Sequence, residues 1–284
     1  MTGIIIVDKP EGWTSQDVAA KLRGVFHERR VGHGGTLDPM ATGVLPVFLG
    51  RATRAVPFFE SAEKEYLTGI RLGTVTDTQD VTGRVLSQSE PDVSEEALRA
   101  ALKAMEGPQL QLPPMYSAIK IGGKKLYELA RAGVEAERSP RPIVLKELEL
   151  LRFDGKEGLF RLVCSKGTYA RTVCHDLGAR LGCGACMSSL RRSRAGRFTL
   201  DEAVTMEEIL QGKAEPLPVD SLFAELPALT LDEADSLRCK NGNPIPFLGL
   251  AEGEYRVYGP DGAFLMLGRQ ENGELKTVKS FFEV

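Results

Sequence analysis

The apolar residues of this chain come in runs of strand length, and no other feature of the sequence constrains the fold as strongly. The longest runs, residues 4–7 and 44–49, fall far short of the roughly 20 residues that span a bilayer. Further strand-like segments occur at residues 66–72 and 159–164, and helical segments separate them. The pattern predicts an α+β fold and no membrane span. The first residues also lack the basic stretch of a signal peptide.

Three segments have the periodicity and the end signals of helices. A helix is expected after Thr14, whose hydroxyl precedes Asp17 by three residues in the manner of a capping box. A second is expected over residues 92–105, which begin with acidic residues and stop at a Gly-Pro pair. A third covers residues 171–181 and is closed by a glycine.

The length of 284 residues suggests about two domains. We expect a first domain over residues 1–215 and a small β-rich module over residues 221–284, joined through a Pro- and Gly-containing linker. Residues 108–142 carry five prolines, a Gly-Gly pair and a cluster of lysines. A segment of this length and composition predicts a long insertion in the first domain, and such loops are commonly functional.

The charge of the chain is unevenly placed. The net charge is −3, yet residues 201–284 hold seven Lys and Arg against sixteen Asp and Glu. Residues 161–200 hold eight basic residues and one acid. Such a cluster is typical of a phosphate or nucleic-acid contact, and charge alone fits a solvated basic face equally well.

The five cysteines do not form a disulfide or zinc pattern. Cys183 and Cys186 form a single CxxC pair without a second pair or spaced histidines. An odd number of cysteines suits a reducing cytoplasm, where we expect the protein to reside. No metal or cofactor is expected.

Residues 32–45 contain four glycines around an Asp-Pro pair. Glycines let the backbone approach another surface closely, and Pro39 biases Asp38 towards an extended conformation. Asp38 is therefore a carboxylate at a stiff point of a close-approach loop. On these residues alone, an ordinary turn aspartate remains the simpler interpretation.

The motif around Asp38 resembles the signature of the TruB family of tRNA pseudouridine synthases. Four further blocks match the family in the same order, and together the five cover most of residues 1–200. The blocks are residues 9–15 (KPEGWTS), 35–39 (GTLDP), 64–66 (KEY), 111–120 (QLPPMYSAIK) and 164–171 (CSKGTYAR), which runs on to 190–192 (LRR). Gly34 stands where relatives often have threonine.

The resemblance implies a mixed-sheet catalytic domain that isomerises uridine 55 in the T loop of tRNA without a cofactor. It implies that Asp38 is the catalytic carboxylate, as nucleophile or electrostatic centre. Arg171 would pair with Asp38, and Tyr66 would stack on the target base and take a sugar proton. Without the family, a phosphate-binding patch is the lesser alternative for Arg171, whereas a tyrosine in an alternating strand such as Tyr66 is more often a buried core residue.

The resemblance also implies how RNA is held. The target base must be flipped out of the T loop, and His33 would fill the vacated space. The insertion would grip the RNA, and basic side chains would position the stem through its phosphates. Asp77 and Asp80 are interpreted as turn-capping acids rather than metal ligands. The RNA-binding residues implied are His33, Lys64, Tyr116, Lys120, Lys166, Arg191, Arg192 and Arg194, with Arg197 as a further phosphate contact.

A second function remains open, namely a tRNA-binding folding chaperone in which catalysis is secondary. The presence of Asp38, Tyr66 and Arg171 favours the enzyme. The resemblance further implies that the protein works as a monomer, and that its last 65 or so residues form a module related to PUA RNA-binding domains.

Overall fold

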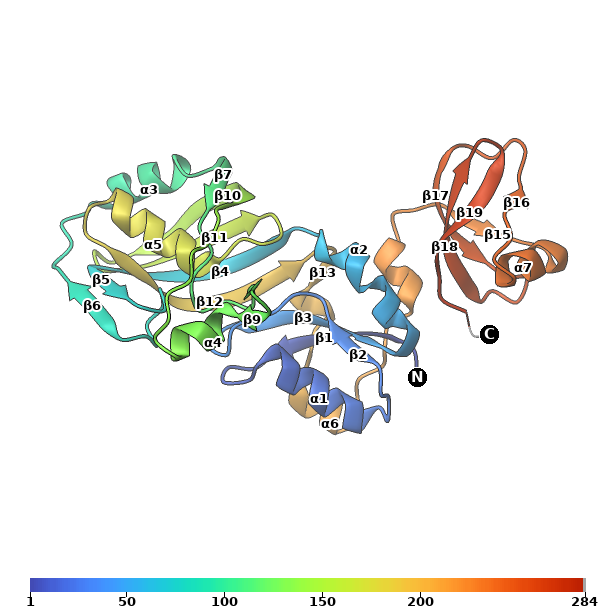
Figure 1. Ribbon diagram of the computed structural model, residues 1–284, viewed down its shortest axis with the longest axis horizontal. Helices are drawn as coiled ribbons and strands as arrows, with labels where there is room; N and C mark the ends of the chain where they lie inside the picture. Colours follow the sequence, from blue (N-terminus) through green and yellow to red (C-terminus); the bar gives the residue numbers. More distant parts are fainter. Residues whose placement is uncertain (283–284) are drawn as a thin grey trace.

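The computed structural model describes residues 1–282 and contains two main sheets, which lie at opposite ends of its long axis (Figure 1). The first sheet has ten strands. They are β1 (Gly3–Lys9), β2 (Val31–His33), β3 (Thr42–Leu49), β4 (Lys64–Leu72), β7 (Gly107–Gln111), β10 (Arg141–Phe153), β11 (Glu157–Cys164), β12 (Ala185–Ala195), β13 (Phe198–Thr199) and β14 (Val204–Thr205).

The first sheet is mixed, and its centre is a short parallel contact. Its strands follow the order β14-β1-β3-β12-β4-β11-β10-β7, while β2 pairs with β3 and β13 with β12. Strands β3 and β12 run parallel and pair only through Arg191↔Thr42 and Arg192↔Gly43. Gly43 has a φ of +100°, and a Cβ there would lie 2.2 Å from the Arg192 carbonyl oxygen. A glycine is therefore required where these two strands meet.

Helices cover the sheet where the sequence predicts them. The capping box of Thr14 and Asp17 is present, and helix α1 (Ser15–Val25) begins directly after it. Helix α3 (Glu95–Lys103) packs on β10, and helix α5 (Ala170–Arg180) packs on β12. Their apolar residues are buried in the same core as the strands. The α+β class with a mixed sheet is confirmed.

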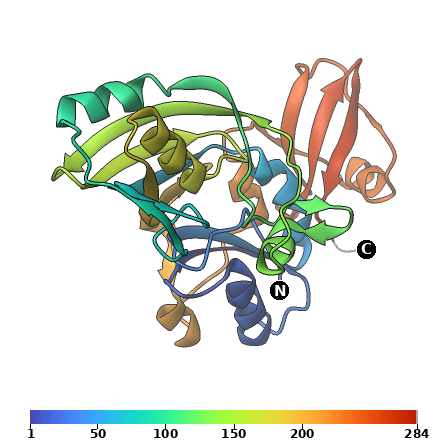
Figure 2. The ribbon, with the colours of Figure 1, turned by 60° about the vertical axis from the view of Figure 1, so that its left-hand side comes forward.

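The predicted insertion begins inside the sheet. Residues 107–111 form the edge strand β7, which pairs with β10 from Gln111↔Arg141 to Gly107↔Leu145. Only the segment between these strands leaves the sheet, as a separate arm that Figure 2 shows in green. The arm contains the short hairpin of β8 (Lys120–Ile121) and β9 (Lys124–Lys125) and helix α4 (Leu126–Arg131).

The C-terminal part is β-rich, as expected. Its five-stranded sheet has the order β15-β17-β18-β19-β16. These strands are β15 (Ala228–Thr230), β16 (Ile245–Pro246), β17 (Gly253–Tyr258), β18 (Phe264–Glu271) and β19 (Glu274–Ser280), with helix α7 (Glu233–Lys240) beside them. The domain limits at 215 and 221 and the PUA relationship remain predictions.

Aromatic side chains join the two parts. Phe223 lies between the sheets, and its ring is 5.6 Å from that of Phe58, 6.3 Å from that of Phe264 and 6.1 Å from that of Phe281. Arg54 also donates to the Ser280 carbonyl at 2.9 Å. The C-terminal module therefore packs against the first domain through one continuous apolar cluster.

The remaining elements are short. They are 3-10 helices η1 (Gly50–Ala55), η2 (Leu200–Glu202) and η3 (Val219–Phe223), helices α2 (Val56–Glu60) and α6 (Met206–Leu210), and the hairpin of β5 (Thr74–Thr76) and β6 (Val85–Gln88). Within residues 1–282, none of the helices combines the length and the apolar character that a bilayer crossing needs.

Candidate active site

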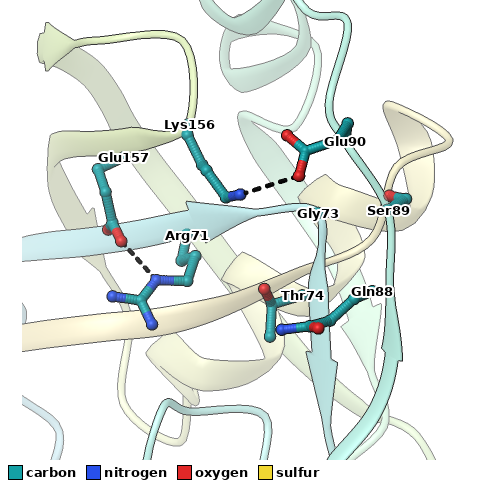
Figure 3. Close-up of a pocket in the computed structure, with 8 residues that line it drawn as sticks. All are labelled: Arg71, Gly73, Thr74, Gln88, Ser89, Glu90, Lys156 and Glu157. Atoms are coloured by element: carbon teal, nitrogen blue, oxygen red, sulfur yellow. Dashed lines mark hydrogen bonds and ion pairs between the residues drawn. The ribbon is translucent and has the colours of Figure 1, made fainter.

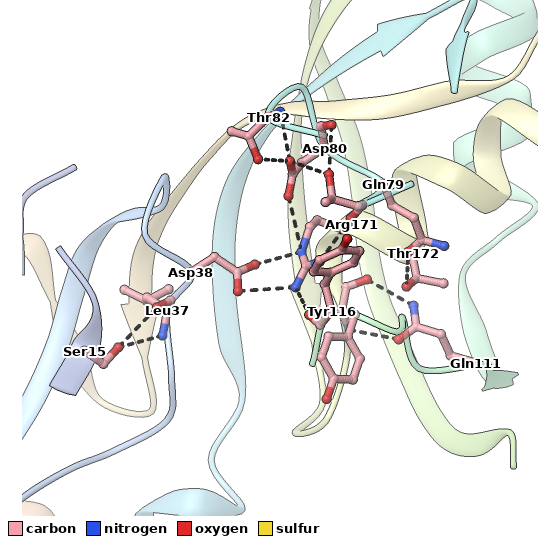
Figure 4. Close-up of polar contacts among 12 residues, drawn as sticks. Ser15, Leu37, Asp38, Gln79, Asp80, Thr82, Gln111, Tyr116, Arg171 and Thr172 are labelled. Atoms are coloured by element: carbon pink, nitrogen blue, oxygen red, sulfur yellow. Dashed lines mark hydrogen bonds and ion pairs between the residues drawn. The ribbon is translucent and has the colours of Figure 1, made fainter. Parts of the chain in front are cut away.

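Asp38 lies in the loop between β2 and β3, which is anchored on both sides of it. The Ser15 hydroxyl bonds both backbone groups of Leu37, accepting from N at 2.8 Å and donating to O at 3.3 Å (Figure 4). On the other side, Gly12 N donates to the Pro39 carbonyl at 2.8 Å, and the Lys9 ammonium lies 3.3 Å from the same oxygen. The backbone is therefore fixed, while the Asp38 side chain stays 36% exposed.

Arg171 holds the Asp38 carboxylate through two contacts. Its Nε donates to Oδ2 at 2.8 Å and its Nη2 to Oδ1 at 3.3 Å. The same guanidinium donates to the carbonyls of Thr78 at 3.0 Å and Tyr116 at 2.8 Å. Arg171 is only 5% exposed, so the fork is held by partners from three separate segments. Such an arrangement orients the carboxylate and offsets its negative charge.

Asp80 is a member of this site that the sequence did not reveal. It caps its own turn, as predicted, accepting from Thr82 N at 2.9 Å and from the Thr78 hydroxyl at 2.8 Å. Its Oδ2 also lies 3.8 Å from the Arg171 Nε, and the side chain is buried. The interpretation as a turn cap was therefore incomplete. The contact with Arg171 arises only when the loop between β5 and β6 folds against α5.

Gln111 was also missed as a site residue. Its amide clamps the backbone of Tyr169, accepting from N at 2.8 Å and donating to O at 3.1 Å (Figure 4). Tyr169 is the N-cap of α5, and Arg171 is the second residue of that helix. The glutamine is 3% exposed, and a buried amide with both groups bonded fixes the start of the helix. It thereby fixes the direction from which Arg171 reaches Asp38.

Tyr66 lies on β4 as the cross-strand partner of Arg192. Burial raises the pKa of the Tyr66 phenol, and the positive charge of Arg192 opposes this rise. The Tyr66 side chain therefore lies in mostly apolar surroundings, with the Arg192 guanidinium as its cationic neighbour.

Two residues expected to bind phosphate are buried instead. Arg192 is 1% exposed, and it donates to the carbonyls of Val44 at 2.6 Å and Gly35 at 3.2 Å. Lys64 is 7% exposed and donates to the carbonyls of Glu60 and Ala62, and burial lowers its pKa to about 8. The charged atoms of both cations are bonded inside the protein, so this geometry does not favour the expected RNA contact of Lys64 or the expected phosphate contact of Arg192.

Two further arginines of β12 are engaged in ion pairs. Arg191 reaches Asp8 through two contacts of 3.1 and 2.8 Å. Arg194 lies 3.0 Å from Glu63 and 3.7 Å from Glu65. Glu65 and Tyr66 are successive strand residues, so their side chains point to opposite faces of the sheet. Arg194 therefore lies on the face away from Tyr66, and its expected phosphate contact is not favoured by this geometry.

The bulge in β12 explains the placement of Arg194. The register of β12 against β4 shifts between Arg192 and Arg194. Such a bulge adds one residue to the strand and changes the alternation of its side chains. The Ser193 hydroxyl accordingly also bonds Glu65, at 2.8 Å. Alternation along the sequence would have placed Arg192 and Arg194 on the same face.

The other expected RNA contacts have different surroundings. His33 lies on β2 with a buried Nδ1 that has no hydrogen-bond partner, and burial, followed by the charge of Arg192, lowers its pKa. Tyr116 is half-buried, and its carbonyl accepts from Arg171. Lys120 is exposed in the arm, and Lys166 is exposed on the rim of a groove of about 540 Å³ along β7 and β10.

A polar pocket of about 620 Å³ lies away from this site, at the other end of β4 (Figure 3). Its basic residues are already paired: Arg71 with Glu157, and Lys156 with Glu90 at 3.4 Å. The positive charges of this pocket are therefore neutralised by neighbouring carboxylates. Within residues 1–282, no group of three or more His, Cys, Asp or Glu is placed to hold a metal.

The fold occurs in solved structures of H/ACA and Cbf5-containing complexes. One is an H/ACA RNP bound to a substrate RNA containing 2'-deoxyuridine, with a TM-score of 0.73 and 25% identity over 99% of this chain and 85% of that one. A Cbf5-Nop10-Gar1 complex has the same TM-score and coverage, at 27% identity. The chain therefore shares its fold with proteins of these complexes.

The sequence comparisons are more specific. Residues 23–170 match the N-terminal domain of TruB family pseudouridylate synthase, and residues 171–222 match the tRNA pseudouridylate synthase B C-terminal domain. The tRNA pseudouridine synthase B of Syntrophomonas wolfei is 42% identical over 98% of this chain and 96% of its own length. That of Aromatoleum aromaticum is 43% identical over 96% and 90%. The chain belongs to the TruB family.

Proposed function

We propose that this protein converts uridine to pseudouridine in tRNA, at position 55 of the T loop. The observation that carries the proposal is the two-point contact between Arg171 and Asp38 in a chain of this family. This chain matches the two relatives named above over nearly their whole length. Both are called tRNA pseudouridine synthase B, and this supports tRNA as the substrate.

In this proposal the reaction is an isomerisation that the side chains of the protein carry out alone. The N1–C1′ glycosidic bond breaks, the uracil turns, and a C5–C1′ bond forms. The proton on C5 is then lost and N1 gains one, so that no atoms or electrons are added overall. Asp38 supplies the negative charge at the reacting carbon, either as a nucleophile or as an electrostatic partner. Arg171 keeps that carboxylate in one orientation, which is what positioning contributes to a rate.

Tyr66 stacks on the flipped base. In a route through sugar deprotonation its phenolate, which the charge of Arg192 favours, takes the C2′ proton and returns it to C2′ when the carbon–carbon bond forms. Flipping costs a few kcal/mol for unstacking, and His33 occupies the space that the base leaves. The exposed lysines Lys120 and Lys166 contact phosphates and position the stem without reading bases. The protein acts on the T stem-loop as a monomer in the cytoplasm.

The experiment is incubation with an unmodified tRNA transcript, followed by mapping of pseudouridine at single-nucleotide resolution. We expect modification at position 55 by the wild type and none by Asp38→Asn. Modification at another position would contradict the assigned site. A wild type that accelerates tRNA folding without forming pseudouridine would favour the chaperone instead.

A further inference from the structure

Arg192 is a buried cation whose charge is not matched by a carboxylate. It is 1% exposed, and no acidic side chain in the described residues lies within ion-pair distance of it. Placing an unpaired charge in the protein interior is strongly unfavourable. A guanidinium kept in such a place requires an explanation beyond packing.

The hydrogen bonds of Arg192 go to the loop that carries Asp38. Its Nε donates to the Val44 carbonyl at 2.6 Å and its Nη2 to the Gly35 carbonyl at 3.2 Å. Gly35 precedes Asp38 by three residues, and Val44 follows it by six. The two bonds therefore hold both ends of the loop. The planar guanidinium fork can bond two carbonyls at once, which a single ammonium group does less well.

The same guanidinium reaches Tyr66. Arg192 and Tyr66 are directly paired across β12 and β4, so their side chains lie on the same face of the sheet. The positive charge of Arg192 also acts on the phenol and opposes the rise in its pKa. Arg192 thus lies beside Tyr66 in the sheet while its guanidinium bonds the Asp38 loop.

The neighbouring lysines do not duplicate this arrangement. The Lys9 ammonium donates to the carbonyls of Pro10 at 2.8 Å and Trp13 at 2.5 Å and to that of Pro39 in the Asp38 loop at 3.3 Å. The Lys64 ammonium donates to the carbonyls of Glu60 and Ala62. Among Lys9, Lys64 and Arg192, only the arginine both pairs with Tyr66 across the strands and bonds the Asp38 loop.

We propose that Arg192 is a positioning residue for the isomerisation, which fixes the Tyr66 phenol relative to the loop carrying Asp38. The proposal rests on the proposed function, because it assigns Tyr66 and Asp38 to one reaction. It predicts that Arg192 acts on the rate through Tyr66 and leaves tRNA binding nearly unchanged.

The geometric part is tested by NMR without any reaction. With ¹³Cζ-labelled tyrosine, Tyr66→Phe assigns the Tyr66 signal. We expect that signal to move at neutral pH in Arg192→Gln, because the phenol loses its cationic neighbour. In the reverse experiment, Tyr66→Phe is expected to move the Nε–H signal of Arg192. This variant removes only one oxygen atom, so a shift reports on the missing hydroxyl. Unchanged signals in either experiment would overturn the contact.

The kinetic part uses single-turnover rates on a tRNA transcript. We expect Arg192→Gln to lower the rate about a hundredfold, as small misplacements of reacting groups do, with a tRNA Kd within about threefold of the wild type. The double variant with Tyr66→Phe should be no slower than the slower single variant, since coupled residues are not additive. Additive losses, or equal losses in rate and affinity, would overturn the proposal.

Two variants keep the kinetic test decisive. Arg194→Gln, two residues away on the other face of the sheet, is the matched control and should stay within about twofold of the wild type. Arg192→Lys keeps the positive charge but lacks the guanidinium fork. It replaces the glutamine variant in the test if that variant does not fold. Its single-turnover rate should be at least tenfold below that of the wild type. Full activity of Arg192→Lys would overturn the proposal. A wild type that forms no pseudouridine would instead refute the proposed function, while the NMR contact would still be measured.

Discussion

The Arg171 guanidinium and the Asp38 carboxylate meet through two parallel contacts although 133 positions separate them in the chain. The arginine comes from the first turn of α5, and the aspartate comes from the loop before β3. The contact therefore forms only when the first sheet has folded, because the sheet brings α5 and the loop before β3 together. Both contacts require the flat fork of an arginine.

Arg171→Lys should lower the single-turnover rate by about a hundredfold or more and change tRNA affinity little. Lysine keeps the charge, but it can satisfy neither both oxygens of Asp38 nor the carbonyls of Thr78 and Tyr116. Rate and Kd measured on the same transcript check this. Comparable losses in the two quantities would argue for a phosphate contact instead.

Asp80→Asn should lower the single-turnover rate by about tenfold, which is less than the effect of changes at Arg171. It should also weaken the turn that Asp80 caps. The variant removes the charge that lies 3.8 Å from the Arg171 Nε but keeps an oxygen for the Thr82 bonds. Asp77→Asn, on the same loop with a side chain that bonds Arg84 N, is the matched control. Equal effects of the two variants would assign Asp80 to the turn alone.

Tyr66→Phe should retain tRNA binding and lose most of the single-turnover rate. Phenylalanine keeps the ring that stacks on the base but removes the oxygen proposed to take the sugar proton. The measurement is the rate with saturating enzyme. Full turnover of this variant would exclude the proton-transfer role and leave stacking as the function of the ring.

Binding of tRNA should weaken steeply with salt, and Lys166 should contribute to the slope. Each lost phosphate contact reduces the dependence of log Kd on log salt by about one unit. We expect that change for Lys166→Ala, whose side chain is exposed, and no comparable change for Arg194→Ala, whose guanidinium is paired with Glu63. A flat salt response of the wild type would rule out phosphate binding as the main source of affinity.

Stability should depend on pH through Lys9. Burial lowers the pKa of its ammonium from 10.5 to about 8, so the folded protein binds this proton less tightly than the unfolded chain. The cost of burying the charge is fully present below pH 8 and disappears as the pH rises towards 10.5. Relative to Lys9→Met, the wild type should therefore gain about 1–3 kcal/mol over this interval. Urea unfolding of both proteins at pH 7.5, 9 and 10.5 measures the difference, and a constant difference would contradict the prediction.

Local features were predictable from the sequence because they depend on neighbouring residues. The helix after Thr14 follows from a hydroxyl and an acid three residues apart, and the predicted capping box is present. The strand at residues 66–72 follows from alternation and lies within β4. The importance of Asp38 came from the family resemblance, since its own surroundings also fit a turn.

The placement of the arginines was not predictable from local pattern. A bulge separates Arg192, which lies inside the site, from Arg194, which lies on the other face. Bulges are set by the pairing strand and by the chain beyond it, and they reverse the faces that alternation assigns. The role of Asp80 depends in the same way on a contact with a helix about ninety positions away, which composition does not reveal.

The aromatic cluster around Phe223 sets a condition on how the C-terminal module can be studied. A chain shortened before Phe264 would leave the rings of Phe58 and Phe223 in contact with water, and such patches promote aggregation. Loss of activity in a shortened protein would then report on solubility and not on RNA. Charge reversals on the exposed strands of the module, which leave this cluster intact, are the informative way to ask what the module contributes.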